Sequence, residues 1–531
     1  MPLPVPIIAL PSDRPQMQPS IESTAPLQGS EITLLPRDIF LMILSYLHYI
    51  DVISCRRVSR SWNATFSNPC NLYPFLKWTF PLAREIRRHH QDKLLNNEHG
   101  IPPHDNHWRK LFNQISARYS HLYRGKPQSI ERYKVWPNYT ENIRPGSRLY
   151  PVPPWEVHSS HMVLKLDQIF EDCFWTYDNG LIVFVSHDDT CILLLDLETS
   201  KTFEVPFDLD DRVIRRIRLQ HRLLVIEWAE ANAFHWLNAL DSVHRHFASS
   251  FDITSYPTGG WDIAFRNEWK LMFLGHPLSD RDRFYSSHNG THYVLYTWQP
   301  NRSLYTSDED APIESLFVWD ISEPSEYKPS TDPSSLHKPT SGPFAVARFS
   351  FRDLDFHSVR QRGIPKMIRL DIDSETSVLD IMESTSPDYE TDPGNTSCYS
   401  HVQVTSIPFL GHGPSWRRDL KMPIPPYRGN TSMYNCSVRG CYPWHTCISE
   451  AIDEGAQVFF TLQTSIQSYT DFKRAPRFEV AIQAPHIDYR FSLLNPRFSS
   501  EIGWKGCIRG DERFVIGEND AQELVVLRFD R

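Results

Sequence analysis

Glycine is scarce in this sequence, and the glycine-rich motifs that hold phosphate groups are missing. Only 21 of the 531 residues are glycine, and neither G-x-x-x-x-G-K-[ST] nor G-x-G-x-x-G occurs. The G-x-S-x-G turn that carries the serine nucleophile of α/β-hydrolases is missing as well. These absences exclude the common nucleotide-binding loops and that class of hydrolase.

Long hydrophobic runs and a basic excess are also missing. No stretch approaches 18 apolar residues, so we expect no membrane span, and proline interrupts the apolar N-terminus as it would not in a signal peptide. The net charge is −9 and the pI is about 6.2, which disfavours a nucleic-acid partner. The locally basic stretch 84–93 is best explained as a solvated helix face. Nine scattered cysteines indicate reduced thiols and a cytoplasmic or nuclear location.

Aromatic residues and prolines, by contrast, are plentiful. The chain has 15 Trp, 22 Tyr, 30 Phe and 41 Pro. Aromatic side chains favour strands, and proline favours turns. The composition therefore predicts a large β domain in a chain long enough for two or more domains.

Residues 31–78 are the most informative stretch, because they predict three short helices in succession. Thr33 is a plausible N-cap of the first helix and Pro36 suits its first turn. We expect a break at 48–50 with Asp51 capping the second helix, Ser59 capping the third, and Asn68-Pro69 ending it. The first helix carries an apolar stripe, with Leu41 and Leu44 beside it: Ile39, Met42, Ile43, Tyr46 and Leu47.

This much apolar surface exceeds what so small a module can bury. About 40 residues rarely form a robust core alone, so such a module usually completes its core with a partner. The alternative is an N-terminal helical cap that packs on the rest of the same chain. The residues by themselves leave these two interpretations open.

The order and spacing of the residues in this stretch resemble an F-box, the motif by which substrate receptors dock onto the Skp adaptor of Skp–cullin ubiquitin ligases. The resemblance is carried by Leu35, Pro36, Ile39, Ile43, Leu44, Leu47, Asp51, Val52, Cys55, Arg57, Val58, Ser59 and Trp62. It implies that Trp62 packs internally and that eight residues bind the adaptor: Leu35, Pro36, Ile39, Ile43, Leu44, Leu47, Val52 and Val58.

We expect the chain to be multidomain, with a small all-α part before a large all-β part. The predicted divisions are a disordered tail (1–30), the F-box (31–78), a helical linker (79–126), a proline-rich connector (127–158) and a β-propeller-like recognition domain (159–531). The linker contains a helical stripe that Gly125 and Pro127 end: Trp108, Leu111, Phe112, Ile115, Tyr119 and Leu122. An aromatic stripe at this spacing indicates core packing.

From residue 163 the periodicity changes to short strands with turns every 8–12 residues, which is typical of a sandwich, barrel or propeller. So long a β region is too large for one sandwich and favours a propeller of six to eight blades. Residues 318–322 resemble the end of a WD-repeat blade. With HWRKLF, RYSHLYRGKP and Leu193–Asp196, the layout is similar to fungal F-box proteins with an irregular propeller-like C-terminal region.

Two segments, 323–343 and 382–398, predict surface loops, because they are rich in Ser, Thr, Pro and acidic residues. They could be mobile, and Ser386-Pro387 could be a phosphorylation site. An inert surface loop is the favoured interpretation.

One cluster has metal-binding residue types: Cys436, Cys441, His445 and Cys447. Its spacing differs from known zinc ribbons and fingers, so we favour buried thiols over zinc, and either over a catalytic Cys–His pair. The sequence therefore predicts no catalytic residue, no metal and no cofactor.

The function expected from the sequence is that of a non-enzymatic substrate-recognition subunit of a Skp–cullin–F-box type E3 ubiquitin ligase. The F-box would dock on the Skp adaptor, and the β domain would present an unidentified protein substrate. Two alternatives remain open. The β domain could be an enzyme of unknown substrate, or the chain could be an F-box scaffold that acts without degradation.

Overall fold

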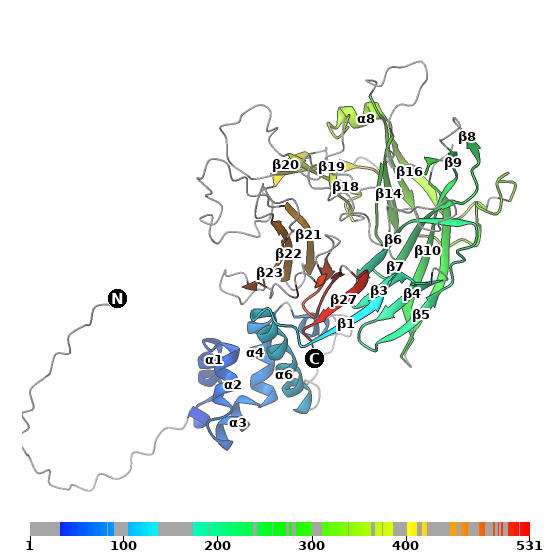
Figure 1. Cartoon of the computed structure of the whole chain (residues 1–531). Coiled ribbons are helices and arrows are strands. Elements are labelled where there is room, and N and C mark those ends of the chain that lie inside the picture. Colours follow the sequence, from blue (N-terminus) through cyan, green and yellow to red (C-terminus); the bar gives the residue numbers. More distant parts are fainter. Residues whose placement is uncertain are drawn as a thin grey trace, which may run out of the picture. The chain divides into compact units, whose positions relative to one another are not determined.

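The chain, described here by a computed structural model, forms two compact units (Figure 1). The helical unit comprises Met1–Pro81 and His99–Phe112, and the β unit comprises Leu82–Glu98 and Asn113–Arg531. The predicted tail lies outside the described residues. The structure describes residues 32–81, 83–89, 105–135, 174–188, 191–236, 242–256, 259–271, 276–278, 283–299, 311–337, 339–362, 367–373, 375–385, 401–410, 417–421, 446–453, 458–465, 477–483, 492–493, 498, 501–502, 508–519 and 521–530.

The helical unit consists of short helices in close succession. Its described elements are η1 (Ile32–Leu34), α1 (Arg37–Ser45), α2 (Tyr49–Cys55), α3 (Arg60–Phe66), α4 (Pro69–Thr79) and the first turns of α6 (Asp105–Tyr123). Aromatic pairs hold these helices together. The ring centroids are 5.0 Å apart for Phe40 and Phe66, and 4.6 Å apart for Tyr73 and Trp108. The predicted helices are therefore present, and α4 adds a further one.

The helix starts agree only in part with the sequence-based expectation. Ser59 caps α3 as predicted, since its Oγ accepts a hydrogen bond from the Trp62 N–H. The N-cap of α2 is His48 rather than Asp51, whose carboxylate instead accepts the His48 N–H in a capping box. Thr33 lies in η1, so it does not cap α1. Asn68-Pro69 starts α4 rather than only ending α3, because proline fits the first helical turn.

The helix predicted between residues 105 and 122 is confirmed as α6. All six residues of its predicted stripe are buried, with exposed fractions between 0% and 6%. Gly125 follows in the left-handed conformation, with φ of 57°, and its N–H donates to the Leu122 carbonyl. Residues 84–89, the described part of the basic stretch, are helical, but the prediction of a solvated face is wrong for Arg84, which is buried and paired with Glu198.

The described β unit contains six four-stranded antiparallel sheets. The first two sheets, in strand order, are β2 (Trp175–Asp178), β3 (Leu181–Val185), β4 (Ile192–Asp196), β5 (Lys201–Val205), and then β6 (Arg212–Gln220), β7 (Leu223–Glu230), β10 (His246–Ser255), β11 (Trp261–Lys270). The third and fourth sheets are β13 (Arg283–His288), β14 (His292–Gln299), β15 (Ile313–Asp320), β16 (Phe344–Phe349), and then β17 (Met367–Asp373), β18 (Val378–Thr385), β19 (His401–Pro408), β20 (Arg417–Lys421). The fifth and sixth sheets are β21 (Thr446–Asp453), β22 (Val458–Ser465), β23 (Arg477–Gln483), β24 (Ser492–Leu493), and then β25 (Arg509–Gly510), β26 (Phe514–Glu518), β27 (Glu523–Arg528), β1 (Ser129–Lys134). A small three-stranded sheet, in the order β12 (His276–Pro277), β9 (Ser242–His244), β8 (His235–Trp236), is inserted among them.

The first strands of several successive sheets lie beside one another. Strand β2 contacts β6 and β25, β13 contacts β17, and β21 contacts β25. Arg216 of β6 donates hydrogen bonds to Ser286 Oγ and the Phe284 carbonyl of β13. Three hydrophobic clusters fill spaces between neighbouring sheets, and the buried run of β3 shows that its sheet is covered on both faces. The described contacts therefore pack the sheets that begin with β25, β2, β6, β13 and β17 against one another in that order, and the sheet of β21 lies beside β25.

Strand β1 corrects the prediction that residues 127–158 form only an extended connector. It pairs antiparallel with β27, from Ser129 opposite Arg528 to Lys134 opposite Glu523. The last sheet of the chain is therefore completed by a strand from the start of the β unit. Its polar sequence, SIERYK, suits an edge strand with few buried side chains.

The first predicted loop, residues 323–343, has no helix or strand in its described part, yet hydrogen bonds hold it against β11. The Ser325 N–H donates to the Arg266 carbonyl at 2.9 Å, and the Ser330 N–H donates to Glu268 Oε1 at 3.0 Å. The second loop prediction needs correction, because β18 extends through Thr385. Ser386-Pro387 and the rest of that segment lie outside the described residues.

Burial of His288 predicts a loss of stability in mild acid. This side chain is 1% exposed, and burial lowers its pKa from 6.5 to about 4. Between these two values the unfolded chain binds a proton that the folded chain does not, so the free energy of unfolding falls as the pH drops from 6.5 towards 4. The gap is worth up to about 3 kcal/mol.

We expect His288→Gln to flatten this part of the pH dependence, as measured by urea unfolding at several pH values. Burial also lowers the pKa of His244, His292 and His357, so part of the dependence will persist. Substitution of the exposed His187 by Gln is the control. An unchanged pH profile in His288→Gln would contradict the prediction.

Candidate functional site: an exposed apolar face and a buried polar network

Helix α1 presents apolar side chains to solvent along one face. Ile39, Met42 and Tyr46 follow the i, i+3, i+7 spacing of a single face and are 44%, 60% and 86% exposed. Phe40 and Leu44 lie on the other side of the helix and are 3% and 1% exposed. The helix thus packs its core with one face and leaves a second apolar face uncovered. We call Ile39, Met42 and Tyr46 the α1 face.

Further exposed apolar side chains lie in the neighbouring elements. Leu34 of η1, Ile50 of α2 and Val58 just before α3 are 78%, 46% and 62% exposed. Exposed apolar side chains concentrated in one small module indicate an interaction surface more than scattered ones would.

The structure separates the eight predicted adaptor-binding residues into three groups. Pro36, Ile39 and Val58 are exposed, and Leu35, Ile43 and Leu47 are half-buried. Leu44 and Val52 are buried in this structure, at 1% and 0% exposed, and their predicted role in adaptor binding stays a prediction. Both side chains pack in the core of the helical unit, because each lies on the inward face of its helix.

Sequence reasoning missed four exposed residues, which are Leu34, Met42, Tyr46 and Ile50. Met42 and Tyr46 belong to the apolar stripe that the spacing identifies, so that stripe was the available signal. Leu34 and Ile50 lie outside the stripe, and their exposure depends on how η1 and α2 pack.

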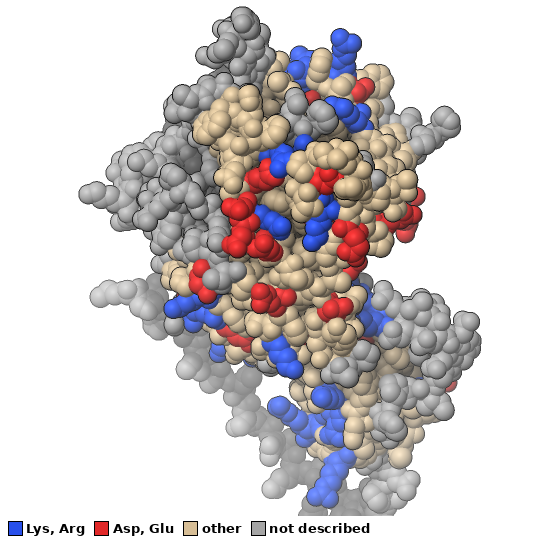
Figure 2. Space-filling model, turned by 90° about the vertical axis from the view of Figure 1, so that its right-hand side faces the viewer, with Lys and Arg blue, Asp and Glu red and all other residues tan. Residues whose placement is uncertain are grey.

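The surface of the β unit carries charges of both signs. On the face in Figure 2, acidic and basic side chains are interspersed over most of the unit. An open cavity of about 560 Å³ lies between β1 and the sheet of β3 to β5. One of its cations, Arg132, is already paired with Glu501 at 2.7 Å. Both observations describe a mixed surface rather than one dominated by a single sign of charge.

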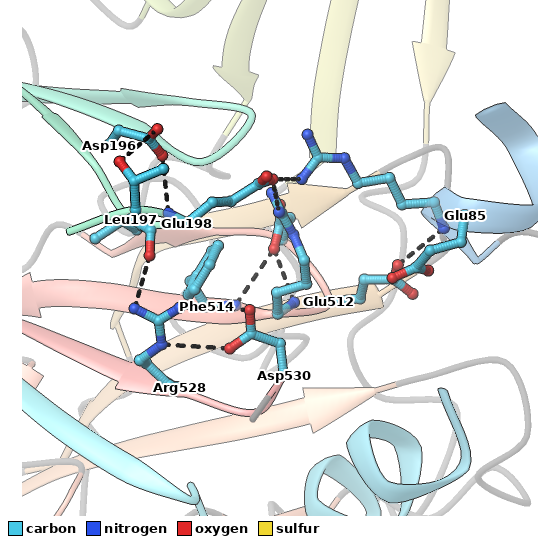
Figure 3. A network of polar contacts seen from close by, with 12 residues as sticks. Glu85, Asp196, Leu197, Glu198, Glu512, Phe514, Arg528 and Asp530 are labelled. Carbon is cyan, nitrogen blue, oxygen red and sulfur yellow. Dashed lines mark hydrogen bonds and ion pairs between the residues drawn. The ribbon is translucent and has the colours of Figure 1, made fainter. Parts of the chain in front are cut away.

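A buried polar network centres on Glu512, in the turn between β25 and β26 (Figure 3). Its carboxylate accepts a hydrogen bond from the Arg84 N–H at 2.9 Å, from Arg118 Nη1 at 2.7 Å and from the Tyr119 hydroxyl at 2.8 Å. Arg118 also forms an ion pair with Glu85. Two helical segments of the β unit, 84–89 and the second half of α6, are therefore attached to one carboxylate.

The network continues across the sheets through further arginines. Glu198 accepts hydrogen bonds from Arg84 at 2.7 Å and from Arg513 at 2.6 Å. Arg528, which is fully buried, donates to the Leu197 carbonyl at 2.8 Å and pairs with Glu131 of β1 at 3.0 Å. The contact between Arg528 and Leu197 connects β27 to the sheet that begins with β2 (Figure 3).

The two acids that share Arg118 respond differently to their surroundings. Burial raises the pKa of the Glu512 carboxyl, although the charge of Arg118 acts against this. Burial would also raise the pKa of Glu85, but the hydrogen bond and charge of Arg118 lower it overall. Burial alone would lower the pKa of Arg118, but the negative charges of Glu512 and Glu85 have the larger effect and raise it. Arg118 therefore stays charged. The arrangement holds a cation between two carboxylates.

Other buried carboxylates in the β unit are likewise held by donors. Glu227 accepts hydrogen bonds from Ser286, Tyr293 and Arg216. Within the described residues, no group of three His, Cys, Asp or Glu side chains is placed to hold a metal ion. Cys436, Cys441, His445 and the side chain of Cys447 lie outside them. No helix in the described part of the chain is long and apolar enough to cross a membrane.

Comparison with known families settles the nature of the helical unit. The F-box domain family matches residues 32–73, which span η1 to the first turns of α4. The chain carries an F-box. The resemblance inferred from Leu35 to Trp62 is confirmed, and an F-box implies binding to the Skp adaptor.

Comparisons beyond the F-box give weak similarities. A search of the curated proteins found no match. Similar solved structures include the mitotic checkpoint complex (8% identity, TM-score 0.31, covering 76% of this chain and 95% of that one). A second is an α-L-arabinofuranosidase from Lactobacillus brevis (10% identity, TM-score 0.24, covering 61% of this chain and 89% of that one). A third is the C-terminal domain of gp131 from bacteriophage phiKZ (8% identity, TM-score 0.24, covering 67% of this chain and 78% of that one).

The network predicts strong coupling between Arg118 and Glu512. Arg118→Met leaves two carboxylates near an apolar side chain, so it should lower the free energy of unfolding by about 3–5 kcal/mol. Glu512→Gln removes one of those charges. The variant with both substitutions should therefore lose less free energy of unfolding than the sum of the two single losses, by at least about 1 kcal/mol.

A double-mutant cycle in urea measures this coupling, with Arg124→Met at the exposed end of α6 as the control. Additive losses from the two single substitutions would show that the ion pair does not hold the segments together.

Proposed function

We propose that this F-box protein is a substrate-recognition subunit of a Skp–cullin–F-box type ubiquitin ligase, with the β unit as its recognition module. The observation that carries the proposal is the F-box match together with the α1 face, which is apolar and open to solvent. F-box proteins are typically adaptors without catalytic activity. The chain would act by holding a bound protein near the ubiquitin-bearing end of the ligase.

The proposed adaptor-binding surface combines the exposed and half-buried residues of η1, α1 and α2. Its centre is the α1 face, because three apolar side chains on one helix stripe can enter a groove of a partner. Pro36 and Val58 extend it, and Leu35, Ile43 and Leu47 are available at its edge. Leu44 and Val52 support this surface from the core.

The β unit has the strand order expected of a six-bladed propeller. Six four-stranded sheets follow one another along the chain, and the first strands lie side by side in four pairs: β2 with β6, β13 with β17, β21 with β25, and β2 with β25. β1 would close the ring by completing the last blade, an arrangement that leaves no gap between the ends of the β unit. Loops at the rims of such a ring would carry the cargo site.

Adaptor binding can be tested on the α1 face without disturbing the core. Ile39→Glu with Met42→Glu places two charges where both side chains are exposed, so folding should persist while co-purification with the Skp adaptor is lost. Leu35→Ala with Pro36→Ala should also abolish co-purification.

The matched control is Trp78→Glu in α4, which charges a similarly exposed apolar side chain (49%) of the same unit. Normal co-purification of the Ile39/Met42 variant, with its expression confirmed, would refute the adaptor-binding surface. Loss of co-purification in the control as well would show that the effect is not specific to the α1 face.

A further inference from the structure

An unusual concentration of arginine and phenylalanine occurs at the outer edge of the sheet that contains β13 to β16. Residues 344–362 cover the edge strand β16, the short helix α8 (Phe351–Phe356) and the turn that follows it. They hold four arginines and two aspartates, a net charge of +2 in a chain whose net charge is −9. We call residues 344–362 the β16–α8 surface.

Three phenylalanines of this surface are turned to solvent. Phe344, Phe351 and Phe356 are 57%, 46% and 70% exposed. Leu354 of α8, by contrast, is fully buried in the core cluster of that sheet and fixes the helix. The exposed rings are therefore displayed by an anchored element.

Arginines of the surface lie over aromatic rings. The guanidinium carbon of Arg348 is 5.1 Å from the ring centre of Phe317, and that of Arg352 is 5.8 Å from the ring centre of Phe351. Among the described residues, no carboxylate lies within ion-pair distance of Arg348 or Arg352, and both are exposed. Stacking on a ring orders a guanidinium group while leaving its N–H edge available for an acceptor.

The other two arginines of the surface, Arg360 and Arg362, make contacts that hold it in place. Arg360 lies over the same Phe351 ring at 5.1 Å and pairs with Asp355 at 2.9 Å, and Arg362 pairs with Asp355 at 2.7 Å. The turn that carries them is tied to the buried Glu314 carboxylate, which accepts the Gln361 and Arg362 N–H groups at 2.8 and 2.9 Å. These contacts therefore fix the position of the β16–α8 surface, which carries Arg348 and Arg352.

We propose that the β16–α8 surface binds an acidic linear peptide of the protein cargo, with an apolar side chain of the peptide seated against Phe351 and Phe356. Arginine and aromatic residues dominate the binding energy of protein interfaces, and guanidinium groups match carboxylates in a bidentate geometry. The positive surface of an otherwise acidic chain selects a negatively charged partner. The inference rests on the proposed function only in assigning the peptide to cargo.

The test uses the full chain and short immobilised peptides in three matched series. The first series combines Asp and Glu with Phe and Leu, the second replaces the acidic residues by Lys and Arg, and the third replaces the apolar residues by Ser and Gly. Peptides of the first series should retain the chain and those of the other two should not, and retention should fall as salt rises.

Variants then locate the site. For the best-retained peptides, Arg348→Glu with Arg352→Glu should weaken binding by at least about tenfold in fluorescence polarisation. Phe356→Ser, at a side chain too exposed to support the core, should weaken it as well. Lys134→Glu with Lys201→Glu makes the same charge change at exposed positions elsewhere on the β unit and should leave binding intact.

Equal retention of the acidic–apolar and basic–apolar series would overturn the proposal, as would unchanged binding by the folded Arg348/Arg352 variant. Co-purification with the Skp adaptor is measured on the same preparations and should be normal in these variants, which lie outside residues 32–73. Failure of the wild-type chain to capture the adaptor, with peptide binding intact, would refute the proposed function and leave the peptide site standing.

Discussion

The attachment of two helical segments to the buried Glu512 carboxylate is the constraint on which the start of the β unit depends. A carboxylate removed from water must be matched by donors, and here the Arg84 N–H, Arg118 and the Tyr119 hydroxyl supply them. Removing any one of these donors would leave the buried carboxylate short of a hydrogen bond and would lower the free energy of unfolding. Residues 84–89 and the second half of α6 are consequently parts of the β unit rather than a separate linker, and the helical unit ends at Phe112 within the same helix.

The two surfaces proposed for adaptor binding and for peptide binding differ in how they are built. The F-box exposes apolar side chains on α1, where water is released when a partner covers them. The β16–α8 surface instead exposes arginines ordered by aromatic rings, which suits a smaller and more polar contact.

Local patterns accounted for the elements that depend on neighbouring residues. The stripe from Trp108 to Leu122 predicted α6, and Ser59 predicted the start of α3, because each signal lies within a few turns of the feature it specifies. The strands from Leu181 to Val205 follow equally from alternating turns and apolar runs. The F-box was identified by the resemblance of residues between Leu35 and Trp62 to a known family pattern.

Features that depend on distant residues were beyond such reasoning. Strand β1 has a polar sequence whose partner lies at the other end of the β unit, so nothing local marks it as a strand. Leu44 and Val52 match the family pattern as well as Ile39 does, and only packing shows that they face inward. The Glu512 network and the arginines of the β16–α8 surface likewise arise from residues that tertiary structure brings together.

The pairing of β1 with β27 also bears on how the chain acquires its structure during synthesis. Glu131 and Arg528, which join the two strands, are separated by 397 residues. The ribosome releases β1 early, but its partner emerges only after every intervening sheet has been made. The nascent β unit therefore carries an unpaired strand edge throughout translation, and its last step is a long-range closure of the slow kind.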